Sequence, residues 1–144
     1  MKAGVLMDAG PIVAFLYRRE QDHDWAVEQF EALSLPFVSC EPAISEACFL
    51  VARNGQPPTA VIDMLKRGIV RVGIQLQDEL AAIDALMARY ANVPMSLAGA
   101  CLVRMAEMTG LPICTLDSDF MIYRAHGRRP IEVICPTPRH LHEP

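Results

Sequence analysis

The chain has 144 residues, of which 52% are hydrophobic, and a formal net charge of −4 at pH 7. This length and this apolar content are typical of one globular domain that buries about two thirds of its unfolded surface. The negative charge excludes a globally basic surface, so any contact with nucleic acid requires a local basic patch.

Short β-prone runs alternate with amphipathic stretches of helical period along the chain. Strands are expected at 2–7, 37–40, 69–74, 113–116 and 131–135, and helices at 11–19, 23–35, 41–54, 57–68, 77–90 and 97–109. Alternation of this kind predicts an α/β fold of three layers, in which a mostly parallel sheet of four or five strands has helices on both faces. We expect one domain over residues 1–136 and a loosely ordered tail over 137–144.

The cysteines and the hydropathy profile indicate the kind of compartment. The five cysteines are odd in number and form no C-x-x-C pair, and four of them lie in apolar runs, so we expect buried thiols. No apolar stretch approaches the ~18 residues of a membrane span, and Asp8 interrupts the first apolar run too early for a signal sequence. These features predict a cytoplasmic protein with no membrane association.

Acidic residues from distant segments fall where predicted strands end. Asp8 closes the first strand, Asp117 and Asp119 follow the fourth, and Glu46 lies in the first turns of the helix after the second. Ligands of open parallel sheets bind outside the carboxyl ends of the strands, so these side chains are expected to converge. Each also has a simpler explanation, since Asp8 would cap a helix, Glu46 would face solvent, and the two later acids would form a turn.

Converging carboxylates repel one another unless a cation lies between them, and oxygen ligands suit Mg²⁺ or Mn²⁺. Such an ion can activate water for in-line attack on a phosphodiester, which makes nuclease chemistry the natural hypothesis. The basic segment that follows the last acids would then hold backbone phosphates through Arg124, Arg128 and Arg129, unless it is merely a solvated loop.

Together these segments resemble the PIN-domain family, and within it the VapC-type toxins of bacterial toxin–antitoxin pairs. The matching pieces are Val5-Leu-Met-Asp8-Ala-Gly-Pro-Ile-Val-Ala-Phe-Leu16, Ile44-Ser-Glu46-Ala, Pro94-Met-Ser-Leu-Ala-Gly-Ala-Cys-Leu-Val103 with Ala106-Glu107, and Ile113-Cys-Thr-Leu-Asp117-Ser-Asp119-Phe120 with Tyr123-Arg124. The resemblance implies Mg²⁺- or Mn²⁺-dependent cleavage of RNA, a homodimer, and inhibition by a small antitoxin protein. It assigns Asp8, Glu46, Asp117 and Asp119 as metal-binding catalytic acids and Thr115 as a hydroxyl that supports them.

One position departs from the family pattern. Where the pattern has an acid, in Met-x-Leu-Ala-Asp-Ala, this chain has Gly99. Ser96, one turn earlier, would hold a metal-bound water or simply cap the helix. Two functions therefore stay open. One is a working ribonuclease, and the other is a degenerate PIN module that binds RNA or a partner protein without efficient cleavage. A phospho-receiver domain is disfavoured because it needs a lysine after the last strand, and the only lysines are Lys2 and Lys66.

Overall fold

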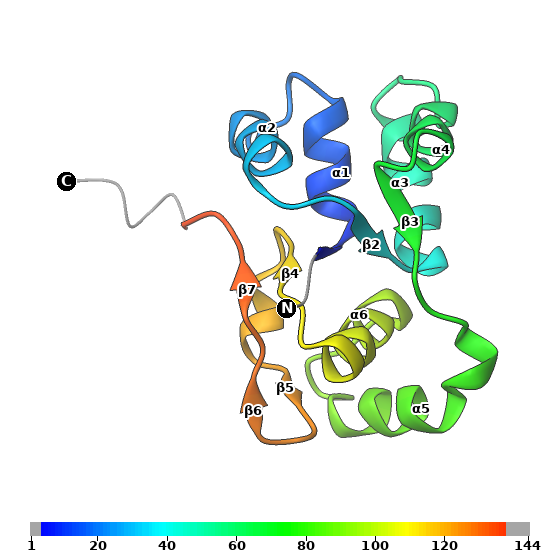
Figure 1. The fold of residues 1–144 in the computed structure, drawn as a ribbon, viewed down its shortest axis with the longest axis vertical. Coiled ribbons are helices and arrows are strands. Elements are labelled where there is room, and N and C mark those ends of the chain that lie inside the picture. Colours follow the sequence, from blue (N-terminus) through cyan, green and yellow to red (C-terminus); the bar gives the residue numbers. More distant parts are fainter. Residues whose placement is uncertain (1–3, 138–144) are drawn as a thin grey trace.

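The computed structural model describes residues 4–137 and confirms the α/β class (Figure 1). Five parallel strands form one sheet in the order β3-β2-β1-β4-β7. The strands are β1 Val5–Met7, β2 Phe37–Ser39, β3 Val70–Val72, β4 Ile113–Cys114 and β7 Val133–Ile134. The helices are α1 Ala9–Leu16, α2 His23–Ala32, α3 Glu41–Arg53, α4 Thr59–Lys66, α5 Leu80–Arg89 and α6 Leu97–Thr109. None of the helices in this part of the chain has both the length and the hydropathy to cross a membrane.

The sheet divides the core in two, because successive side chains of a strand point to opposite faces. Leu6 of β1 packs with residues of α5 and α6, including Ile83 and Leu102. Its neighbours Val5 and Met7 pack on the other face, which α1 to α4 cover. Figure 1 shows the same division, with α5 and α6 on one side of the strands and the four earlier helices on the other. The predicted three layers are therefore present.

Some helix boundaries differ from the predicted ones. The first helix begins at Ala9 rather than Pro11, because the carboxylate of Asp8 accepts a hydrogen bond from the Ala9 N–H. The predicted helix at 77–90 is divided into a short 3₁₀ turn, η1 Leu76–Asp78, and α5. The last helix has the predicted bounds, with Ser96 as its N-cap and Gly110, at φ 72°, as its C-cap.

A small hairpin was not predicted. Its strands, β5 Arg124–Ala125 and β6 Arg129–Pro130, pair antiparallel across a turn at His126 and Gly127, whose φ angles are 54° and 76°. Two consecutive positive φ angles are the requirement of a type I′ hairpin turn. The His126 N–H donates to Glu107 Oε2 over 2.7 Å, which joins the turn to α6.

All five cysteines are free, and Cys40, Cys101 and Cys114 are buried as predicted. Cys48 and Cys135 are half-buried. The predicted tail lies outside the described residues except for Thr137.

Candidate functional site

A hollow of about 380 Å³ lies at the carboxyl edge of the central strands. It is lined by one residue after β1, by one from α1, by two from α3, by the first turn of α6, and by the segment after β4. The lining residues are Asp8, Gly10, Glu46, Leu50, Ser96, Gly99, Leu116, Asp117 and Phe120. Three of the four predicted catalytic acids therefore meet at one place, and Asp119 does not line it.

Asp8 lies directly after β1, and hydrogen bonds to both of its carboxylate oxygens fix its side chain. Oδ1 accepts a hydrogen bond from the Ala9 N–H over 2.8 Å, and Oδ2 accepts one from Thr115 Oγ1 over 2.7 Å. Burial raises the pKa of Asp8, the hydrogen bonds from Thr115 and Ala9 lower it, and the nearby charge of Asp117 raises it again. The two explanations left open by the sequence are compatible, since this side chain caps α1 and also lines the hollow.

Thr115 connects two of the acids. This buried residue follows β4, and its hydroxyl donates to Asp8 while it accepts the backbone N–H of Asp117 over 2.9 Å. One side chain thereby fixes the end of β1 against the end of β4, although Asp8 and Asp117 are far apart in the sequence. The sheet aligns the two strand ends, and the Thr115 hydroxyl sets their spacing.

Asp117 and Asp119 have different positions. Asp117 Oδ1 accepts the Asp119 N–H over 2.9 Å and so caps η2, a 3₁₀ turn over Ser118–Met121. Asp117 lines the hollow as well, whereas Asp119 contributes its backbone N–H to the cap. The turn explanation therefore holds for the Asp-Ser-Asp segment, and only the first of its acids reaches the hollow.

Glu46 lies on the exposed side of α3, and the charges of the other two acids affect its pKa. Burial of its carboxyl raises its pKa, and the charges of Asp8 and Asp117 raise it further. The three carboxyl groups thus repel one another, and no arginine or lysine is among the residues that line the hollow. Among the described residues, no three His, Cys, Asp or Glu side chains stand close enough together to hold a metal ion as they are. The donor chemistry is nevertheless that of a hard cation, with carboxylate oxygens and the Ser96 hydroxyl facing one hollow.

Gly99 forms part of the hollow wall, and Ser96 stands beside it. The Ser96 hydroxyl accepts the Gly99 N–H over 3.0 Å, which is an N-cap hydrogen bond. A Cβ at position 99 would lie 3.3 Å from Ser96 Oγ, 3.6 Å from Met95 Cγ and 3.9 Å from Phe120 Cζ. Among the described residues, Asp8, Glu46 and Asp117 are the acids that line the hollow, and none lies next to Gly99 on α6.

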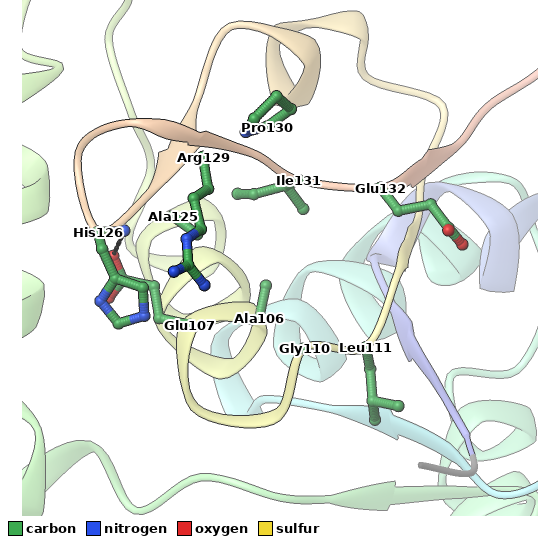
Figure 2. A pocket seen from close by; sticks show the side chains of 10 residues that line it. All are labelled: Ala106, Glu107, Gly110, Leu111, Ala125, His126, Arg129, Pro130, Ile131 and Glu132. Carbon is green, nitrogen blue, oxygen red and sulfur yellow. Dashed lines mark hydrogen bonds between the residues drawn. The ribbon is translucent and has the colours of Figure 1, made fainter. Parts of the chain in front are cut away.

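The predicted substrate-binding arginines lie outside the hollow. The guanidinium of Arg124 donates to three backbone carbonyls, those of Met121, Ile122 and Tyr123, at the end of η2. Arg128 and Arg129 belong to the β5–β6 hairpin beside the C-terminal half of α6. Figure 2 shows Arg129 at a second hollow, of about 200 Å³, which Glu107 and His126 also line. Gly99 and Glu107 are eight residues apart on α6, or about 12 Å along its axis.

The structure adds four residues that the sequence did not single out, namely Gly10, Leu50, Leu116 and Phe120. A Cβ at Gly10 would lie 3.1 Å from Leu116 Cγ, so the glycine lets the first turn of α1 approach the segment after β4. The sequence signal for this contact was the glycine two residues after an acid at a strand end. No sequence signal marked Leu50 and Phe120, because apolar residues in such positions usually belong to the core.

No protein-family model matches this chain, and no curated protein matches it either.

Proposed function

We propose that this protein is a PIN-type endoribonuclease that depends on Mg²⁺ or Mn²⁺ and acts as the toxin of a toxin–antitoxin pair. The observation that supports the proposal most is the meeting of Asp8, Glu46 and Asp117 at one hollow, where Thr115 ties two of them together. The charge of Asp117 raises the pKa of Asp8, and the charges of both raise the pKa of Glu46; this repulsion costs stability, and a cation between the carboxylates would remove that cost. Such costs are typical of functional sites.

In this proposal Asp8 and Asp117 are the fixed ligands of the ion. Asp8 is oriented by the Ala9 N–H and by Thr115, and Asp117 is oriented by the Asp119 N–H, so neither must reorganise. Glu46 is exposed on α3 and would be the third ligand. When bound, the ion would supply an activated water and a positive centre for the scissile phosphate. Asp119 acts here through its backbone, and Ser96 is the neutral group beside the position where the family pattern has an acid.

The degenerate module stays as a second proposal because of Gly99. With three carboxylates instead of four, the hollow attracts divalent ions less strongly, and occupation by two ions becomes unfavourable. A protein of this kind would keep RNA or partner binding and lose efficient cleavage.

Cleavage of labelled RNA in Mg²⁺ or Mn²⁺ tests both proposals. Three proteins are compared, which are the wild type, Gly99→Asp, and Asp8→Ala combined with Gly99→Asp. Metal-dependent cleavage by the wild type, abolished by chelation, supports the ribonuclease. Cleavage by Gly99→Asp alone, lost again with Asp8→Ala, supports the degenerate module. Absence of cleavage by every variant on several RNAs would contradict the nuclease proposal.

The partners belong to the same proposal. We expect a cytoplasmic homodimer that binds a small antitoxin, and light scattering after size exclusion would measure its mass. Arg128 and Arg129 would contact RNA only some distance from the scissile phosphate, because the hairpin lies beside the far half of α6.

A further inference from the structure

The exposed face of α3 carries three side chains of different chemistry in a line. Glu46, Phe49 and Arg53 follow the spacing i, i+3, i+7, which places residues on one side of a helix. All three are exposed, and Leu50, the neighbour of Phe49, lines the acidic hollow. The line therefore begins at the hollow and leads away from it along α3, over about 10 Å.

Phe49 is unusual among the aromatic residues of this protein. Its side chain is 65% exposed, and it is the only aromatic residue in the exposed class within residues 4–137. The other ring contacts form two groups, Phe15–Phe30–Phe37 and Tyr90–Tyr123–Phe120, with one stacked pair and three edge-on pairs, whereas Phe49 has no ring partner among the described residues. The core does not account for a phenyl ring at this position.

Arg53 lies one turn beyond Phe49 and forms no ion pair with any described residue. Arg53 lies in the last turn of α3, where any basic residue would interact favourably with the helix dipole. The combination with Phe49 is more specific, because it offers an aromatic face and a guanidinium side by side. Nucleic acids present the matching alternation of aromatic bases and anionic phosphates.

We propose that this face of α3 binds single-stranded RNA, with Phe49 stacking on a base and Arg53 binding a phosphate. The inference rests on the proposed function, since it names the substrate class and the direction in which the strand leaves the acidic hollow. A duplex does not fit this arrangement, because its bases are already stacked and paired and leave no free face for Phe49.

The test measures binding rather than turnover. Labelled single-stranded RNA decamers and a duplex of the same sequence are titrated with protein in Ca²⁺, and gels confirm that the RNA stays intact. Phe49→Ala is expected to weaken single-strand binding by about 5- to 140-fold, the range for one stacked base, and to leave duplex binding unchanged. Phe49→Trp is expected to retain binding, and in a Trp25→Phe background its fluorescence should be quenched by RNA. Arg53→Gln should weaken binding and reduce the salt slope by about 1.

Matched controls come from elsewhere on the surface. Leu35 is 59% exposed in the segment before β2, at the opposite edge of the sheet, and Leu35→Ala should not change RNA binding. Arg67 is already paired with Asp63, so Arg67→Gln should have little effect. Phe49 is exposed, so its variants are expected to keep the wild-type melting temperature, and this is verified first.

Unchanged affinity of Phe49→Ala, equal losses for single strand and duplex, or no RNA binding by the wild type would each overturn the inference. A Phe49→Ala variant impaired only in binding a protein partner would overturn it too, and would identify the face as a protein-binding surface. The nuclease proposal and this inference can fail separately. RNA binding that depends on Phe49, without cleavage by any variant, would support the RNA-binding face and contradict the nuclease. Metal-dependent cleavage that does not depend on Phe49 would support the nuclease alone.

Discussion

Replacing Thr115 with valine tests whether its hydroxyl links the two strand ends of the acidic hollow. Valine has nearly the same shape, so the change removes one buried hydroxyl and leaves no cavity. Asp8 Oδ2 then loses a hydrogen bond that is worth about 1.5–3 kcal/mol when the acceptor is charged, and the Asp117 N–H loses one worth about 0.5–1.5 kcal/mol. We expect the free energy of unfolding to fall by about 2–4 kcal/mol, which for a chain of this size lowers the melting temperature by roughly 6–15 °C.

The pH dependence separates this mechanism from a packing defect. The Thr115 hydroxyl lowers the pKa of Asp8 in the folded protein, so without it the folded-state pKa rises further above the ordinary value. A folded-state pKa that is raised costs stability as the pH increases through it. The deficit of Thr115→Val should therefore be larger at pH 7 than near pH 3, where Asp8 is protonated in both proteins and the lost hydrogen bond of the Asp117 N–H remains. Thr115→Ser, which keeps the hydroxyl, should show no such pH dependence. Denaturant unfolding at both pH values measures this, and an equal deficit at pH 3 and pH 7 would refute the reasoning.

Three further outcomes are expected. Asp8→Asn keeps an N-cap and removes a charge that burial disfavours, so in metal-free buffer the variant should be more stable than the wild type at pH 7. The gain in melting temperature should be absent near pH 3 and grow as the pH rises above about 4. A gain independent of pH would contradict this. Gly99→Asp should bind Mn²⁺ more tightly than the wild type in isothermal titration calorimetry. An unchanged affinity would mean that the new side chain points away from the hollow. Gly127→Ala should destabilise the β5–β6 hairpin by about 1–2 kcal/mol, because φ is +76° and the new Cβ meets the Arg89 guanidinium, and hydrogen exchange at residues 124–130 should report it.

The placement of the acids could be predicted because it follows from topology. In a parallel sheet every strand ends at the same edge, so residues directly after β1 and β4 are neighbours whatever their separation in sequence. Asp117 could be assigned for the same reason, whereas the supporting role of Thr115 was expected only from the family resemblance. Asp119 and Glu46 depend on local geometry. Asp119 lies within one turn of 3₁₀ helix and does not line the hollow, and Glu46 reaches the hollow from an exposed position on α3.

The basic segment could not be predicted in the same way. Its sequence shows arginines near the acids, but the hairpin carries Arg128 and Arg129 to the other half of α6, through a turn that a single glycine and a histidine at positive φ allow. Arg124 is used for the carbonyls at the end of η2. The unpaired cation nearest to Glu46 along its own helix is Arg53, which no motif singled out. Charge near a motif in sequence is therefore a poor guide to charge near a site in space.

Gly99 decides between the two proposed functions, and the structure makes its replacement interpretable. Its backbone is ordinary helix, so no positive φ requires glycine, and glycine within a helix costs roughly 1 kcal/mol relative to alanine. The tightest contact of an added Cβ is the Ser96 hydroxyl, an exposed side chain that can shift by a few tenths of an ångström. An acid at this position also lies three residues after the N-cap serine, where it complements the helix N-terminus. Neither folding nor packing demands glycine here, so loss of structure is not the expected result of Gly99→Asp, and a change in metal affinity or cleavage would report directly on the hollow.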